Sequence, residues 1–242
     1  MKIAEISGRL KSEILNLVFP ENMYCLCCGD AMEPSRVHGI CDACAARIDW
    51  NTSNPFREES FAFDDLWPCC RYGAYPRRII SGMKLGSKPY AAGSVGLLLA
   101  ERLEMTGEKD VVIVPVPMYA QKQQQRGFNQ AELLARAAAE KLGLPFLAKA
   151  LVKTKPTKSM RLSSGDERRQ LQGDAFELSE GAAEAICGKH VVLVDDVVTT
   201  GSTADACAKI LKEGGAVRVS VLCFASSYGY KRLDTDGDND VE

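Results

Sequence analysis

The sequence contains only two histidines, His38 and His190, among its 242 residues. Catalysis through several histidines and metal sites built on imidazole are therefore nearly excluded. Charge of one sign is not in excess either, since 30 basic side chains face 32 acidic ones and the formal net charge is -2. The chain as a whole thus lacks the excess of positive charge that is typical of nucleic-acid-binding proteins. Long hydrophobic runs are lacking, because no segment approaches the roughly 18 apolar residues that a membrane-spanning helix requires.

The first 20 residues also lack the continuous apolar stretch of a secretory signal. Their apolar side chains recur at helical spacing with charges between them, which predicts an amphipathic helix carrying Ile3, Ile6, Leu10, Ile14 and Leu17. We therefore expect a cytoplasmic, reducing location. In that compartment a cysteine cluster is more often a metal site than a disulfide framework.

Cysteine is abundant, with ten in the chain and seven of them between residues 25 and 70. Cys25 and Cys28 form one C-x2-C pair, and Cys41 and Cys44 form a second. Two such pairs place four thiolates on a tetrahedron that suits Zn(II), and Gly29 permits a tight turn after the first pair. The spacing therefore predicts a structural zinc site on these four cysteines.

The ligand register leaves alternatives open. Cys27 could replace Cys28, and His38 could replace one of the thiolates. The remaining cysteines are isolated or lie in apolar stretches, where a buried thiol is the default interpretation. We predict core positions for these five residues: Cys69, Cys70, Cys187, Cys207 and Cys223.

After residue 65 the pattern changes to that of an α/β domain. Apolar runs predict strands at residues 66–75, 111–116, 191–194 and 217–225. Helical periodicity predicts helices at residues 91–105, 129–142 and 202–213, the second with Asn129 as its N-cap and Gly143 at its exit. Strands that alternate with helices of this length imply a mainly parallel sheet with ligand loops at the carboxyl ends of its strands.

The most informative segment is VVLVDDVVTTGST at residues 191–203. An apolar strand ends in two adjacent carboxylates, Asp195 and Asp196, and a loop of small hydroxyl residues then leads into a helix. Backbone N–H groups at a helix N-terminus bind anions, while the carboxylates can accept hydrogen bonds from sugar hydroxyls or help to hold Mg(II). A structural turn would explain the hydroxyls but not the paired acids, so we interpret the segment as a ribose-5-phosphate cradle.

This segment resembles the signature of type I phosphoribosyltransferases, which bind 5-phosphoribosyl-1-pyrophosphate (PRPP) with Mg(II). The resemblance implies that Asp195 and Asp196 contact the ribose and are the catalytic residues. It also implies that the following loop binds the 5′-phosphate and completes the PRPP site, with Val197, Thr199, Thr200, Gly201, Ser202 and Thr203.

A second segment, VPVPMYAQKQQQRGFNQAELLAR at residues 114–136, is similar to the hallmark of the ComF family. Residues 83–86, residues 162–176 and the cysteine arrangement fit the same family. Its members fuse an N-terminal zinc ribbon to a phosphoribosyltransferase domain, and they include competence proteins needed for uptake of transforming DNA. The implied organisation is a helix and zinc ribbon at 1–60 and a phosphoribosyltransferase-like α/β domain at 61–233. The resemblance does not extend to residues 234–242, whose acidic side chains predict a disordered tail.

The residues between these motifs complete the expected site. Arg126, beside the glutamine-rich QKQQQ, is expected to contact phosphate, and Lys84 is a weaker candidate for pyrophosphate or DNA. Residues 149–170 hold seven basic and two acidic side chains with Pro156 and Gly165, which indicates a mobile basic loop. It would close over PRPP as a lid or contact a DNA backbone.

Two functions follow. The resemblance favours a ComF-type protein that binds Mg-PRPP and assists DNA uptake by contacting single-stranded DNA and the uptake machinery. Few aromatics near the ribbon could stack bases, and these could equally pack the ribbon on the main domain: Trp50, Phe56, Phe61 and Phe63. The alternative is an active PRPP-dependent transferase in nucleotide metabolism or salvage. No group of residues marks a pocket for its acceptor.

Overall fold

The computed structural model describes residues 23–33, 38–50, 61–84, 91–155 and 175–227. The expected N-terminal helix, most of the basic segment and the acidic tail lie outside the described residues, as does Phe56. No helix within these ranges is long and apolar enough to cross a membrane.

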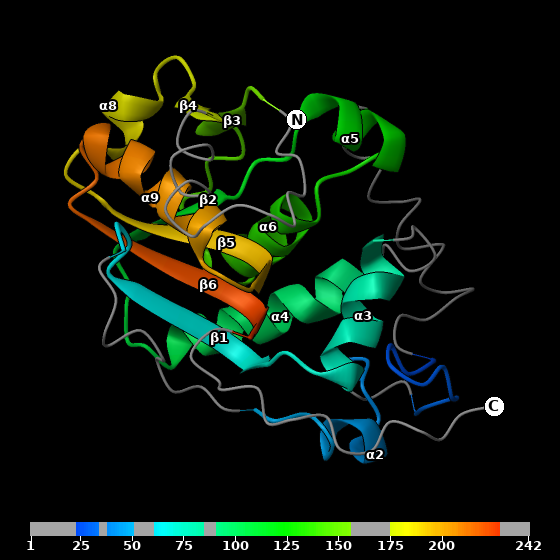
Figure 1. Cartoon of the computed structure of the whole chain (residues 1–242). Coiled ribbons are helices and arrows are strands. Elements are labelled where there is room, and N and C mark those ends of the chain that lie inside the picture. Colours follow the sequence, from blue (N-terminus) through cyan, green and yellow to red (C-terminus); the bar gives the residue numbers. More distant parts are fainter. Residues whose placement is uncertain (1–22, 34–37, 51–60, 85–90, 156–174, 228–242) are drawn as a thin grey trace, which may run out of the picture.

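A four-stranded parallel sheet forms the centre of the fold (Figure 1). Its order is β1 (Asp65–Arg71), β6 (Arg218–Ser226), β5 (His190–Val198) and β2 (Val111–Pro115). All four predicted strands exist, and the parallel arrangement is confirmed. Pro68 and Pro115 lie in the two edge strands, where a residue without a backbone N–H is tolerated.

Helices cover both faces of this sheet (Figure 1). On one face, Val192 and Val194 of β5 share a core with α4 (Ala91–Glu104) and α6 (Gln130–Leu142). On the other face, Val191 and Leu193 pack in a second core with α8 (Ala182–Ile186) and α9 (Ser202–Glu213). The alternation along one strand explains why β5 is apolar on both sides before it reaches its acids.

The predicted start and end of α6 are confirmed. The Asn129 side chain accepts a hydrogen bond from the N–H of Ala131, and Gly143 ends the helix with a left-handed φ of 65°. Asn129 Nδ2 also donates to the carbonyl of Val116 at 3.0 Å. The cap therefore fixes the chain that leaves β2 as well as the helix that follows it.

The predicted strand at residues 66–75 is too long, because β1 ends at Arg71 and α3 (Ala74–Lys84) begins three residues later. The buried face of α3 carries Pro76, Ile79, Ile80 and Met83 at a helical spacing, and this pattern outweighs the short extended run before it. Five further elements were not expected: α2 (Asp42–Ala45), α5 (Ala120–Arg126), α8 and the antiparallel pair β3 (Leu151–Lys153) and β4 (Phe176–Leu178).

Four of the five predicted core thiols are buried: Cys69, Cys70, Cys207 and Cys223. The prediction for Cys187 was wrong, because this residue is exposed. It ends α8 and precedes Gly188, whose φ of 68° begins the surface turn into β5. An isolated cysteine in a turn lacks the apolar neighbours that bury the other four.

Phe63 is also a core residue, at 5% exposure, and it stacks on Phe61 with 4.8 Å between the ring centroids. The backbone N–H of Ala62 donates to Asp205 on α9 at 2.6 Å. Residues 61–64 are thus packed on the α/β domain, and the ring of Phe63 cannot stack on a base.

Helices α4 and α6 approach most closely at Gly96. A Cβ at Gly96 would overlap the Cβ of Ala137, whereas a Cβ at Gly93 in the same helix would meet no atom within 4 Å. We expect Gly96→Ala to lower the free energy of unfolding by about 1–3 kcal/mol through overpacking. The matched Gly93→Ala should raise it by up to about 1 kcal/mol, because alanine favours a helix. Urea unfolding measures both, and equal effects would contradict this packing.

Candidate functional site

A cavity of about 460 Å³ opens at the carboxyl ends of β2 and β5. Its volume lies within the range of small-molecule pockets. It is lined by Lys84, Val116, Pro117, Met118, Tyr119, Gln121, Lys122, Gln125, Asn129, Gln130, Ala131, Lys153, Asp195 and Asp196. Neighbouring parallel strands end at one edge, so the turn after β2 and the acids of β5 meet although about 80 residues separate them in sequence.

The two carboxylates are held in place by the backbone at the end of β5. Asp195 Oδ1 accepts a hydrogen bond from the N–H of Asp196 at 2.8 Å, and Asp196 Oδ1 accepts one from the N–H of Val197 at 3.0 Å. Burial, and next the charge of Asp196, raise the pKa of Asp195 well above its usual range. The pair therefore favours a state in which Asp195 carries a proton and can donate a hydrogen bond.

Lys84 compensates the second acid. Its Nζ lies 2.6 Å from Asp196 Oδ2, and its side chain is 37% exposed against 13% for Asp196. Sequence reasoning assigned Lys84 only a minor role, since nothing in its local pattern reveals that the end of α3 faces the end of β5. The ion pair makes Lys84 part of the acid site.

The hydroxyl loop follows the acids directly. Gly201 has a φ of 75°, which favours glycine, and it begins α9. Thr200 Oγ1 and Ser202 Oγ are hydrogen-bonded at 2.8 Å. Five of the predicted loop residues do not line the cavity: Thr199, Thr200, Gly201, Ser202 and Thr203. The loop therefore flanks the cavity at the N-terminus of α9.

Arg126 does not line the cavity either. Its guanidinium donates to Gln130 Oε1 at 2.6 Å, and Gln130, only 3% exposed, lines the cavity wall. Arg126 thus acts behind Gln130 in this structure. Arg126 ends α5 and Gln130 begins α6, so their contact depends on the turn between the two helices and not on helical periodicity.

Sequence reasoning did not single out the basic residues Lys122 and Lys153 as individual cavity residues, although Lys153 was counted in the basic segment. Lys153 comes from β3, and its Nζ lies 4.9 Å from the centroid of the Phe176 ring. Burial lowers the pKa of Lys153. The cavity therefore combines two acids with three lysines, a mixture that suits a ligand with both hydroxyl and anionic groups.

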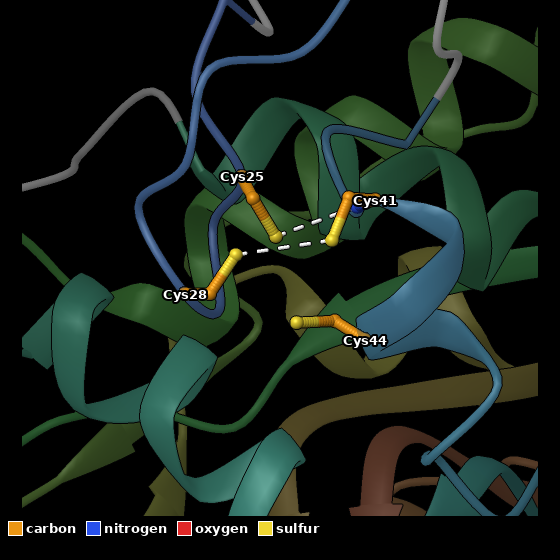
Figure 2. A group of neighbouring side chains, drawn as sticks. All are labelled: Cys25, Cys28, Cys41 and Cys44. Carbon is orange, nitrogen blue, oxygen red and sulfur yellow. Dashed lines mark hydrogen bonds between the residues drawn. The ribbon is translucent and has the colours of Figure 1, made fainter.

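Figure 2 shows the second constellation, in which Cys25, Cys28, Cys41 and Cys44 converge. Their sulfur atoms all lie within 4.8 Å of one another, and Cys28 Sγ is 3.8 Å from Cys41 Sγ. Tetrahedral bonds of about 2.3 Å to a zinc ion would separate sulfurs by about 3.8 Å. These four residues could therefore hold a metal ion of that size.

Backbone N–H groups stabilise the thiolate form of Cys25. The N–H groups of Cys27 and Cys41 each donate to Cys25 Sγ at 3.4 Å. Burial opposes ionisation of this thiol, but hydrogen bonds from the backbone of Cys41, Cys28 and Cys27 lower its pKa to about 6. Gly29, with a φ of 82°, makes the expected tight turn.

The alternatives for the ligand register have other partners. The Cys27 thiol donates to the carbonyl of Tyr75 at 3.7 Å. His38 Nε2 lies 3.2 Å from a carboxylate oxygen of Glu101. Neither residue belongs to the group of convergent ligands, which leaves the four predicted cysteines.

A polar network at the opposite, amino-terminal edge of the sheet resembles a serine–histidine–acid arrangement. His190 Nε2 lies 2.9 Å from Ser220 Oγ, and His190 Nδ1 lies 3.4 Å from Glu108. Ser220 is 0% exposed and donates to Asp65 Oδ2 at 3.0 Å. A buried hydroxyl whose proton is already donated cannot attack a substrate, so this network joins strands and is not a candidate active site.

The part of the chain that forms most of the cavity matches a known domain family. Residues 88–241 match the model of the phosphoribosyl transferase domain, which is more than half of the chain. The match includes the turn after β2, the hairpin strands, the acid pair and the hydroxyl loop. Strand β1 and the cysteine cluster precede it.

Three relatives agree with this match. Competence protein F of Haemophilus influenzae is 38% identical over 109 residues, which cover 45% of this chain and 47% of the relative. DNA utilization protein YhgH of Escherichia coli K12 is 34% identical over 134 residues, or 55% and 53% of the two chains. Competence protein ComFC of Bacillus subtilis is 32% identical over 114 residues, or 47% and 43%.

The chain thus spans about half the length of the curated relatives it matches. The domain match covers three of the four strands of the parallel sheet and the acid pair at its carboxyl edge. The chain belongs to the phosphoribosyl transferase domain family and is a ComF family protein.

Proposed function

We propose that this protein binds Mg-PRPP at the carboxyl edge of its sheet and assists DNA uptake as a ComF-type protein. The observation that carries the proposal is the acid pair, Asp195 and Asp196, opening into a cavity that also holds three lysines. The names of the relatives, two competence proteins and a DNA utilization protein, support the role in DNA uptake.

Each part of the ligand has a matching group. The carboxyl groups of Asp195 and Asp196 accept hydrogen bonds from the ribose hydroxyls or donate to them. Val197 does not line the cavity, and its backbone N–H holds Asp196 in place. Backbone N–H groups between Thr199 and Thr203, at the start of α9, receive the 5′-phosphate. Lys122 and Lys153 offset the charge of the pyrophosphate, and bound Mg(II) would neutralise part of the same charge. Arg126 contributes by holding Gln130 in the wall.

The same arrangement could support transfer. Loss of pyrophosphate would pass through an oxocarbenium-like state, and the acid pair would orient the ribose for it. Pyrophosphate release in the presence of purine, pyrimidine and amine acceptors distinguishes an active transferase from a protein that only binds PRPP.

Replacing both acids with amides tests the proposed ribose-5-phosphate cradle. Asp195→Asn/Asp196→Asn should weaken Mg-PRPP binding at least about tenfold, or about 1.4 kcal/mol, because the ribose loses both carboxyl groups as hydrogen-bonding partners. Isothermal titration calorimetry measures the affinity. The control is Asp110→Asn/Glu140→Gln, which removes two exposed charges away from the cavity and should bind like the wild type. Equal affinity in all three proteins, or no binding by any of them, would overturn the cradle.

We also propose that the four cysteines hold a structural zinc ion within a ribbon at residues 1–60, attached to the domain at 61–233. Cys28→Ser should lose most of the zinc and lower the melting temperature, because binding free energy at such a site contributes to folding. Cys187→Ser is the matched control, since Cys187 is the other exposed cysteine and lies in a turn far along the chain. Atomic absorption gives zinc per chain. A full complement of zinc in Cys28→Ser would refute the ligand assignment.

Contact with single-stranded DNA would use the basic residues beside the cavity. Lys149 and Lys155 are exposed on either side of β3. Lys149→Ala/Lys155→Ala should weaken binding to an oligothymidine at low salt and reduce the salt slope by about 1.4, or about 0.7 for each phosphate that is no longer neutralised. Fluorescence anisotropy measures both quantities. Lys109→Ala/Lys141→Ala, also exposed, should change neither, and no binding by the wild type would exclude direct contact.

A further inference from the structure

Lys84 is the last residue of α3, and it reaches into the cavity to pair with Asp196 at 2.6 Å. The other oxygen of Asp196 accepts the N–H of Val197. The two oxygens of this carboxylate are thus held by different elements, one by the backbone of β5 and one by the end of a helix. Only the contact with Lys84 depends on where α3 lies.

The opposite end of α3 lies against the cysteine module, defined here as residues 23–33 and 38–50. The Cys27 thiol donates to the carbonyl of Tyr75, in the first turn of the helix. Arg47 donates to the Tyr75 hydroxyl at 2.7 Å. Two guanidinium groups, from Arg47 and Arg78, lie 5.7 and 5.4 Å from the centroid of the Tyr75 ring.

One apolar core joins the module to the helix. Cys25, Cys27 and Cys44 belong to the same buried cluster as Ile79 and, one turn further along α3, Met83. The helix has 11 residues and is about 16 Å long, so it connects the module rigidly to the acid site. A shift of the module would therefore move Lys84 relative to Asp196.

We propose that Lys84 is a positioning residue for the acid pair, and that the metal-loaded cysteine module sets its position through α3. This inference rests on the proposed function of the acid pair in binding Mg-PRPP. Lys84 cancels the charge of one acid and fixes its orientation, so that two neighbouring carboxyl groups can receive an anionic sugar phosphate. Without the metal, the first turn of α3 loses its support and the ion pair loosens.

A double-mutant cycle on the full chain tests this coupling. Lys84→Met should weaken Mg-PRPP binding about tenfold, and Lys84→Arg should restore most of the affinity. Removing zinc with a chelator should weaken the wild type to a similar extent but change Lys84→Met less than about twofold. Equal losses on zinc removal in the wild type and in Lys84→Met would overturn the coupling, as would no loss in the wild type.

If the protein unfolded when zinc was removed, Mg-PRPP binding would also be lost. A variant that keeps all the cysteines and its zinc is therefore needed. Arg47→Ala removes one contact of the module with Tyr75, and circular dichroism verifies that it and the stripped wild type stay folded. Arg47→Ala should weaken Mg-PRPP binding when introduced into the wild-type chain and leave binding unchanged when introduced into Lys84→Met. The same loss in both backgrounds would overturn the path through α3.

A measurement without PRPP separates this inference from the proposed function. Brief acetylation followed by peptide mass spectrometry reports how freely each lysine reacts. Zinc removal should raise the acetylation rate of Lys84 several-fold and leave that of the exposed Lys109 unchanged. If PRPP binds nowhere but Lys84 responds, the proposed function fails and the coupling stands. An unchanged rate at Lys84 overturns the coupling whether or not PRPP binds.

Discussion

The compensated acid pair at the end of β5 is the constraint on which the site depends. The strand is buried on both faces from Val191 to Val194, so it delivers its next two side chains to a partly desolvated edge. Two carboxylates cannot both ionise freely there. Backbone N–H groups and the ion pair between Asp196 and Lys84 compensate the two acids. Burial and the neighbouring acid raise the pKa of Asp195. The ion pair brings the end of α3 to this edge of the sheet, where Lys153 of β3 and the turn after β2 also line the cavity.

The two edges of the sheet show the difference between a structural and a functional polar cluster. At the amino-terminal edge Arg218 binds both Asp65 and Glu108 at 2.7 Å, and Ser220 and His190 complete the network. Both acids of this network are paired with Arg218, and the central hydroxyl, that of Ser220, is buried. At the carboxyl-terminal edge the charged groups line a cavity, where Lys122, Lys153 and the two acids can face a ligand. The chemistry that remains for a ligand is thus confined to one edge.

Local patterns predicted much of this fold. The alternation in residues 217–225, the cap and exit of α6 and the limits of α9 follow from signals within a few residues, and the structure confirms them. The C-x2-C spacing also indicated the four convergent cysteines, with Cys27 and His38 left as alternatives that only the structure decided. The misses have a common cause: the end of β1, the exposure of Cys187, the partner of Arg126 and the site of Lys84 depend on which elements pack together. Periodicity within a segment does not contain that information.

Lys84 lies at the end of the helix that connects the cysteine module to the acid site. A zinc ribbon attached only by a linker would be independent of the α/β domain, and its cysteines would need no contact with the core. Here Cys25, Cys27 and Cys44 share one buried cluster with α3. The helix that covers them is the helix whose last side chain neutralises Asp196. The helix thus contacts the cysteine module at one end and the acid pair at the other, and this arrangement is the geometric basis of the proposed coupling.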